Sequence, residues 1–531
     1  SEMISQMGVD VVTEEISRKN NVDEKEAFII KQWSFVNRIL NSAQWVARQG
    51  NKVHFVETTS FGCGPDAFFV DEVRSLLNRY GKSLTLLKID DINNVGSMKL
   101  RVRSLIDSLK FESREQSEVK PFVKPQRFEV GDNQRRKILA PFFTEYLSPL
   151  FPAAFKWAGF DLESLPLSNA ESNDVGLKYS NNEVCYPATL IVGDMIKALQ
   201  SGKYDLDKVA VAVTQLGQCR AANYPPLIRK AIVDAGFSQV PVIGIGGTDN
   251  TEDQPGFKLN LIKAAPLVIY ATMYGDWLSI FYHAIAVRER NKGEARKLRD
   301  LYLDKAKPLV EKNDTKGLLK LTGEAARAFN AVPIYEDRVY PKAGITGEIF
   351  LKFNPYAHRY VPDWLMEHGV EVIPSTVHNF FFRAFVNYKF NRDNFVTRSK
   401  VPPLVIDMAY NLIRKIMKKL ESEASQFRFY TPEQDIKTIS EYAKDIVSIS
   451  AQFGEGWLLP AEVIAFIKDG CNNVISMQPF GCIANHIVAR GIEKKLKSKY
   501  PQLNMLSLDF DGGVSEANIA NRLLLFTSNM K

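Results

Sequence analysis

The sequence has few of the residues that most often hold metals or act as nucleophiles. It contains five cysteines and six histidines among 531 residues. No two cysteines form a C-x-x-C pair, which excludes zinc ribbons and thioredoxin-like redox motifs. Five cysteines are too few for a disulfide scaffold in a chain of this length. If the cysteines share a metal, the fold must therefore gather them from distant positions.

Familiar nucleotide-binding and hydrolase motifs are also lacking. The segment "YGKSLTL" contains Gly-Lys-Ser, but Leu76 stands where a phosphate-binding loop has its first glycine, and a strand pattern follows. The segment "IGIGGTDN" follows a strand pattern, but Asp249 replaces the third glycine of a dinucleotide fingerprint. No G-x-S-x-G segment occurs. The sequence thus predicts neither an ATPase nor a dinucleotide enzyme.

Long membrane-compatible runs and concentrated charge are absent as well. The net charge is +7 and is spread among acidic residues, so no nucleic-acid partner is predicted. The first twenty residues are polar and acidic, which is unlike a signal peptide. The most apolar run, 264–287, contains Asp276, Pro266 and His283, which favours a buried helix over a membrane span. We expect a cytoplasmic protein with no membrane partner.

What the sequence does contain is an alternation of apolar strand patterns and amphipathic helix patterns. This order is typical of parallel sheets with crossover helices. We expect an α/β protein made of several Rossmann-like or flavodoxin-like parallel-sheet lobes, with added helices, around a central cleft. The expected lobes are 1–115 with an N-terminal helix, 138–340 with a helical segment, and 341–531. The charged stretch 116–137 is expected to be a linker.

Two parts of the chain look like copies of one unit. Residues 61–63 and 480–482 both read Phe-Gly-Cys, each between a strand pattern and a helix pattern. Each is followed by a tyrosine, a second strand pattern with aspartates, and an arginine-containing helix. An ordered series of this length is rarely matched by chance. We interpret it as an internal duplication.

Four cysteines stand immediately before predicted helices. Cys63, Cys219 and Cys482 lie in strand-to-helix turns, and Cys185 precedes a helix without an obvious strand before it. In open parallel sheets, ligands bind outside the carboxyl ends of the strands. Helix N-termini also stabilise thiolates. Glycines beside the cysteines would let the backbone approach a bulky ligand; they are Gly62, Gly64, Gly217 and Gly481.

Four such thiolates suit an iron–sulfur cluster or a zinc site made of cysteines alone. Zinc sites usually use closely spaced ligand pairs, so scattered single cysteines favour a cluster in a cleft between lobes. Buried cysteines often have no function, and we assign that packing role to Cys471 in "KDGCNNV". Glu348, in "GITGEIF", and Glu455, in "FGEGW", could place carboxylates in the cleft or could simply cap turns.

Together these segments resemble a known family. "FGCGPDAF", "NNEVCYPATLIVGDMIKAL", "QCRAANY", "GEIFLKFNP", "GEGW" and "QPFGCIANHIVARGI" are similar to the C-terminal half of large acyl-CoA dehydratase activase-related proteins. These belong to the 2-hydroxyacyl-CoA dehydratase and benzoyl-CoA reductase system of anaerobic bacteria. The resemblance runs from about residue 32 to the end of the chain. One departure is "QLGQCR" around Cys219, which has fewer glycines than the family's segment.

The resemblance implies a function. In that system an activase with an ATPase fold passes one electron, driven by ATP hydrolysis, to a dehydratase that carries [4Fe–4S] clusters. The resemblance implies that Cys63, Cys185, Cys219 and Cys482 ligate such a cluster. True dehydratase subunits leave one iron open for substrate, whereas a fourth cysteine would favour electron relay. The activase modules are expected as partners, in the same full-length polypeptide, because the present sequence resembles only the portion that follows them.

The leading hypothesis is a [4Fe–4S] protein that accepts a low-potential electron from an activase and could act on an acyl-CoA thioester. Glu348 and Glu455 are then the candidates for acid–base or substrate contacts. Two alternatives stay open at this point. One is a non-catalytic scaffold or cluster-delivery partner, and the other is a zinc-stabilised structural protein.

Overall fold

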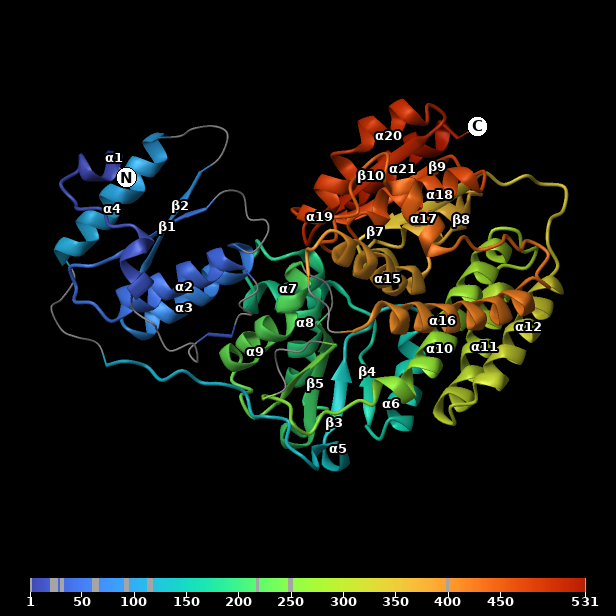
Figure 1. The fold of residues 1–531 in the computed structure, drawn as a ribbon, viewed down its shortest axis with the longest axis horizontal. Helices are drawn as coiled ribbons and strands as arrows, with labels where there is room; N and C mark the ends of the chain where they lie inside the picture. The colour runs from blue at the N-terminus through green and yellow to red at the C-terminus, as the bar shows by residue number, and fades with distance from the viewer. Residues whose placement is uncertain are drawn as a thin grey trace.

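The computed structural model describes residues 2–19, 27–28, 33–59, 66–89, 95–111, 118–215, 219–246, 252–397 and 401–530. Its three sheets contain only parallel strand pairs and are covered by helices, which confirms the expected α/β class. In Figure 1 the first sheet lies at one end of the molecule, and the second and third sheets lie beyond it. No helix of the described residues is long and apolar enough to cross a membrane.

The first sheet is a two-stranded unit built near the N-terminus. Strands β1 (Phe55–Thr59) and β2 (Leu84–Lys88) pair in parallel and are joined through helix α3 (Asp66–Arg79). Helix α2 (Ser34–Ala47) buries Val36, Leu40 and Ala43 on one stripe against α3. The remaining helices of this unit are α1 (Glu2–Ser5), η1 (Glu14–Lys19) and α4 (Val95–Phe111).

The second sheet has the strand order β4-β3-β5-β6. Helix α8 (Tyr186–Gln200) is apolar on nearly all sides and is correspondingly buried all round. The strands are β3 (Lys137–Ala140), β4 (Leu162–Ser164), β5 (Val209–Thr214) and β6 (Val242–Ile245). The other helices are α5 (Asp132–Arg135), η3 (Ser148–Leu150), α6 (Phe151–Trp157), α7 (Ala170–Tyr179), η4 (Leu206–Lys208), η5 (Arg220–Asn223) and α9 (Tyr224–Asp234).

The third sheet has the order β10-β9-β7-β8. Its strands are β7 (Lys342–Gly347), β8 (Glu371–Ile373), β9 (Asn473–Pro479) and β10 (Asn504–Phe510). Its helices are α13 (Ile349–Phe353), α14 (Val361–Glu367), α15 (Val377–Asp393), α17 (Ile436–Ala443), α18 (Leu458–Lys468), α19 (Ile483–Asn485), the π-helix η6 (His486–Arg490), α20 (Glu493–Lys499) and α21 (Glu516–Ser528). The helix pattern that follows the second Phe-Gly-Cys segment is therefore interrupted by a π-helical turn.

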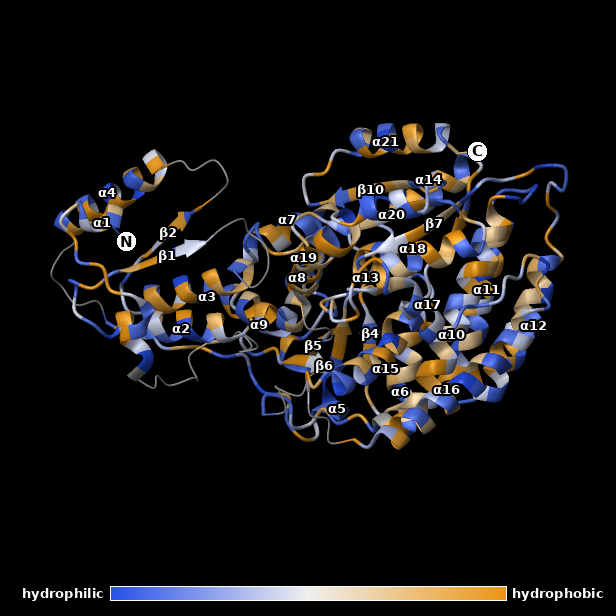
Figure 2. Cartoon of the chain, turned by 45° about the horizontal axis from the view of Figure 1, so that its top comes forward, coloured by the Kyte–Doolittle hydropathy of each residue, from blue (hydrophilic) through white to orange (hydrophobic). Residues whose placement is uncertain are grey.

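Four long helices form a separate bundle with its own core. They are α10 (Leu261–Ala286), α11 (Glu294–Glu311), α12 (Thr315–Asn330) and α16 (Pro403–Ala424). Aromatic residues of α10 and α12, including Phe281 and Phe329, meet Phe427 in this core. Figure 2 shows polar and apolar residues alternating along α12 and α16, as expected for helices that bury one face. Because α16 comes from beyond residue 341, the helical segment is not confined to 138–340.

The suspected duplication is matched by the order of elements. The first unit runs β1, α3, β2, α4, and the end of the chain runs β9, α19 to α20, β10, α21. In both units the two strands pair directly and in parallel. Residues 61–63 lie outside the described residues, so only the second Phe-Gly-Cys turn can be examined in detail.

The segment 116–137 is only partly the linker that its charge suggests. Phe128 has no exposed surface and packs with Ile138 in the core of the second sheet. Arg136 is buried beside Asp132, with 3.4 Å between Nε and Oδ2. The latter half of this segment therefore belongs to the second unit, because one buried aromatic anchors it there.

A buried histidine joins the helical bundle to the third sheet. Asp276, from the middle of α10, accepts the backbone N–H groups of Val377 and His378 at 2.8 and 3.1 Å. The His378 ring lies between two carboxylates, 2.8 Å from Asp276 and 2.6 Å from Glu433. Burial alone would lower the pKa of His378, but Glu433 and Asp276 outweigh it and raise the pKa to about 10. Asp276, whose charge made a membrane span unfavourable in the sequence, is thus paired with His378 inside the protein.

Replacing His378 by glutamine should lower the melting temperature sharply at neutral pH, because the buried Asp276 and the half-buried Glu433 lose the cation between them. A broken buried pair typically costs about 3–5 kcal/mol. The pKa of His378 in the folded protein lies above its ordinary value of 6.5. The contribution of its ion pairs to the free energy of unfolding is therefore complete below pH 6.5 and is lost as the pH rises through about 10. Thermal melts at pH 6 and above pH 10 measure it. His368→Gln, at an exposed position, is the control, and equal melting temperatures for both variants at pH 6 would contradict the prediction.

Candidate functional site

The described candidate residues lie in loops at the carboxyl ends of parallel strands or at the start of helices. Glu348 directly follows β7, and Cys482 follows β9. Cys219 lies between β5 and η5, and Cys185 is the N-cap residue of α8. Such sheet edges are where open α/β folds bind ligands. The sequence-based placement of Cys185, Cys219 and Cys482 before helices therefore agrees with the structure.

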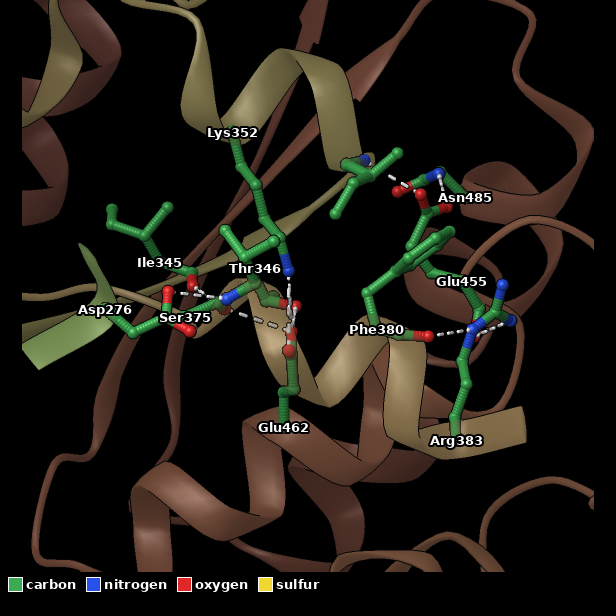
Figure 3. A network of polar contacts seen from close by, with 12 residues as sticks. Asp276, Ile345, Thr346, Lys352, Ser375, Phe380, Arg383, Glu455, Glu462 and Asn485 are labelled. Atoms are coloured by element: carbon green, nitrogen blue, oxygen red, sulfur yellow. Dashed lines mark hydrogen bonds and ion pairs between the residues drawn. The ribbon is translucent and has the colours of Figure 1, made fainter. Parts of the chain in front are cut away.

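Glu348 and Glu455 both cap the short helix α13. Glu348 Oε2 accepts the backbone N–H of Leu351 at 2.8 Å, and Glu455 Oε1 accepts that of Ile349 at 2.8 Å. Glu455 is almost completely buried. The other carboxylate oxygen of Glu455 accepts the side-chain amide of Asn485 at 3.2 Å, as Figure 3 shows. Of the two alternatives left open by the sequence, the structure shows the capping role for both glutamates; a role as cleft carboxylates stays a prediction.

The proximity of these two acids changes the chemistry of Glu348. Burial raises the pKa of Glu348, and the Glu455 carboxylate raises it further, to about 8, against the opposing effect of the Leu351 and Phe350 N–H groups. Glu348 therefore holds a proton at neutral pH. A carboxyl group with a pKa in this range can donate or accept a proton near pH 7.

Glycines allow the two acidic turns to form. Gly347 has φ of +141°, and a methyl group there would lie 1.9 Å from the Met477 carbonyl oxygen. Gly454 and Gly456, on either side of Glu455, have φ of +56° and +55°. A methyl group on Gly456 would lie 2.0 Å from the Ala451 carbonyl oxygen. The motifs Gly-Glu and Gly-Glu-Gly are thus needed for the backbone path itself.

Two cysteines have polar partners from neighbouring elements. Cys185 Sγ lies 3.2 Å from the hydroxyl of Tyr224, at the start of α9. Cys482 Sγ accepts the side-chain amide of Asn485 at 3.3 Å, and the same amide bonds Glu455. A hydrogen bond donated to a sulfur favours the thiolate form that a metal requires, and Asn485 is such a donor to Cys482. Asn485 thus connects one cysteine to the acidic pair.

Cys219 belongs to the same neighbourhood. A methyl group on Gly454 would lie 3.9 Å from Cys219 Sγ and 3.1 Å from the Ala484 Cβ. Tyr224, which contacts Cys185, is buried, and its pKa is raised first by burial and then by Cys185, Glu348 and Cys219. The structure therefore brings three of the four predicted cysteines and both predicted glutamates around Tyr224, Gly454 and Asn485.

A cavity of about 410 Å³ borders this neighbourhood. Its wall includes Val184 and Tyr186, on either side of Cys185, and Gly481, which precedes Cys482 and has φ of +71°. The last residue of β2, Lys88, also lines the cavity, and the loops after β9 and β10 contribute Phe480 and Asp511. The cavity thus lies where all three units meet, which matches the expected cleft between lobes.

The remaining predicted residues divide into two groups. Cys63, Gly62, Gly64 and Gly217 lie outside the described residues, so their place relative to the site stays a prediction. Cys471 is 3 % exposed, and burial raises the pKa of its thiol to about 11 while Sγ contacts the Asn473 carbonyl at 3.3 Å. It packs in a separate core, consistent with the packing role predicted for it.

Several important residues were not predicted from the sequence. Tyr224 and Asn485 could have been suspected from "NYPP" and from the spacing of Asn485 three residues after Cys482. Lys352 and Glu462 form a buried ion pair at 3.3 Å, with Thr346 and Ser375 also donating to Glu462 (Figure 3). Lys352 and Glu462 are 110 positions apart, so no local pattern indicates this pair.

The donor set can be tested against the predicted metals. Among the described residues, no three His, Cys, Asp or Glu side chains surround a single position where an ion could bind. A lone zinc ion needs such a set. In a cubane cluster each thiolate ligates a different iron, so its ligands can be more widely spaced. A cysteine-ligated cluster is anionic. Hydrogen-bond partners of the sulfurs, the nearby helix N-termini and the buried Arg383 would stabilise that negative charge.

Comparisons of the whole chain with protein-family models and with curated proteins returned no match.

The strained turn at Gly456 gives a direct test of the site's construction. Gly456→Ala should lower the melting temperature by several degrees, because the methyl group would clash with the Ala451 carbonyl that accepts the Trp457 N–H at 2.7 Å. Gly470→Ala is the matched control, since Gly470 also has positive φ (+81°) but nothing lies within 4 Å of its methyl position. The control should cost only about 1–2 kcal/mol. Equal effects in thermal melts would show that the turn is not constrained as described.

The raised pKa of Glu348 predicts a pH-dependent stability. The pKa of Glu348 is about 8 in the folded protein and 4.5 ordinarily. The protonated Glu348 therefore contributes fully to the free energy of unfolding below pH 4.5, and this contribution is lost as the pH rises through 8. Glu348→Gln mimics the protonated acid and should not lose that stability. Its melting temperature relative to wild type should therefore rise between pH 5 and pH 9. Glu367→Gln, at an exposed position, is the control, and a flat difference for Glu348→Gln would refute the raised pKa.

Proposed function

We propose that this chain is the cluster-holding, dehydratase-like component of a 2-hydroxyacyl-CoA dehydratase or benzoyl-CoA reductase type of system, working in the cytoplasm. The observation that carries the proposal is the gathering of Cys185, Cys219 and Cys482 around the Glu348–Glu455 pair, beside a cavity between the three units. With Cys63, these cysteines would hold a [4Fe–4S] cluster. The family resemblance of the same segments supports this assignment.

When bound, the cluster would supply low-potential one-electron chemistry, with the electron delivered by an ATP-driven activase. The chain's own residues would provide the surroundings. Tyr224 and Asn485 hold Cys185 and Cys482 by hydrogen bonds. Glu455 fixes the start of α13. Burial, aided by the Glu455 carboxylate, raises the pKa of Glu348 and keeps a proton on it. These contacts give the site both sulfur ligands and a protonated acid, which an electron-coupled acid–base step requires.

An acyl-CoA thioester is the substrate class that the proposal assigns. The 410 Å³ cavity is in the range of small-molecule sites. Its lining combines apolar side chains such as Leu177 and Phe480 with a few polar ones such as Asn173. Such a mixture can hold an acyl group and orient it by hydrogen bonds.

Iron analysis tests the proposal directly. The full chain, purified and reconstituted without oxygen, should contain about four irons and a similar amount of acid-labile sulfide. Cys185→Ser, Cys219→Ser and Cys482→Ser should each lose iron and weaken the visible absorption of the cluster, because each removes one ligand. Cys63→Ser extends the test to the fourth ligand.

Cys471→Ser is the matched control, because Cys471 is buried in a separate core, and its iron content should equal that of the wild type. A wild-type chain that takes up no iron under these conditions would refute the proposal. Uptake of about one zinc in place of iron, lost in the same cysteine variants, would instead favour the structural zinc protein. Unchanged iron in all four cysteine variants would refute the ligand assignment.

A further inference from the structure

Five arginines are buried in the described part of the chain, and one differs from the others. Arg383, on α15, is 6 % exposed. The other four each lie within 4 Å of at least one carboxylate: Arg136 with Asp132, Arg229 with Asp253, Arg288 with Glu371, and Arg299 with Glu145. Among the described residues, no carboxylate forms an ion pair with Arg383.

The partners of Arg383 are neutral. Nε donates to the Phe380 carbonyl at 2.9 Å, and Nη1 points to the carbonyls of Gln452 and Glu455 at 3.4 and 3.3 Å. The guanidinium also lies over the Phe380 ring, 4.3 Å from its centre. Figure 3 shows the side chain directed toward the Glu455 loop. Burying a cation without an anion costs free energy, and dipoles of carbonyl groups offset only part of it.

The anionic groups near Arg383 belong to the candidate site. Burial lowers the pKa of Arg383, and the groups that oppose this effect are Glu455, then Cys219, then Glu462. Glu455 already accepts the N–H of Ile349 and the amide of Asn485. Glu462 is neutralised by Lys352. Of the three, Cys219 alone is a proposed cluster ligand, so Arg383 borders the place where the proposal puts additional negative charge.

We infer that Arg383 is a positioning residue that neutralises an anionic cluster at this site and raises its reduction potential. The inference rests on the proposed function. A cluster with cysteine thiolates carries net negative charge, which becomes more negative when it gains an electron. A fixed cation nearby therefore stabilises the reduced state relative to the oxidised state. Hydrogen bonds, charge and burial around a cluster are the means by which a protein sets its potential.

The test is a redox titration of the reconstituted full chain, followed by electron paramagnetic resonance, with the electron supplied by a low-potential reductant. Arg383→Gln removes the charge but keeps a hydrogen-bond donor. This variant should raise the ratio of oxidised to reduced cluster at least tenfold at a given potential. For a one-electron couple, that change equals a shift of the reduction potential by about 59 mV to more negative values. Arg383→Lys keeps the charge and should stay close to the wild type.

Arg392→Gln is the control. It makes the same change of charge nine residues further along α15, where the Arg392 side chain is 38 % exposed and pairs with Asp393. Its potential should match the wild type, because solvent screens an exposed charge. Circular dichroism and melting temperature confirm that each variant is folded.

The outcomes separate this inference from the proposed function. A cluster that forms in Arg383→Gln with an unchanged potential would overturn the inference and leave the proposed function intact. An equal shift in Arg392→Gln would also overturn it, since the effect would then be one of net charge. A wild-type chain that assembles no cluster would overturn both. A loss of cluster in Arg383→Gln that Arg383→Lys restores would support the neutralising role.

Discussion

The start of helix α13 is the point on which the candidate site depends. Two of its first N–H groups are satisfied by different carboxylates: Glu348, which directly follows β7, and Glu455, from a loop more than a hundred residues later. Hydrogen bonds from N–H groups hold the two acids close together, at a separation where two negative charges would repel. The proton held by Glu348 follows from this arrangement. So does the position of Asn485, which links Glu455 to Cys482.

Buried charges recur through the molecule, both between units and within them. His378 lies between Asp276 of the helical bundle and Glu433. Lys352 and Glu462 join α13 to α18 inside the third unit. Such pairs are costly to desolvate and add little net stability, but removing one partner is strongly unfavourable. They therefore fix which surfaces can meet. Arg383 stands apart from this pattern, since no paired carboxylate from the described chain accompanies it.

Much of the architecture could be predicted from the sequence because the patterns are local. Alternating strand and helix patterns correctly indicated parallel sheets, and the repeated Phe-Gly-Cys segments indicated two similar strand–helix units. The prediction was less accurate where long-range packing decides. Phe128 draws a charged segment into the second core, and α16 leaves the third unit to pack in the helical bundle. Neither contact has a periodic signal in the sequence.

For the site, the sequence by itself determined which residues stand at strand ends and helix starts: Cys185, Cys219, Cys482, Glu348 and Glu455. The glycines beside the two glutamates were equally visible as permissive backbone positions. Only the tertiary structure decided that both acids cap one helix, that Tyr224 and Asn485 contact the sulfurs, and that Arg383 is buried without a carboxylate. Local sequence specifies backbone conformation, whereas proton affinity and charge balance depend on distances between residues far apart in the chain.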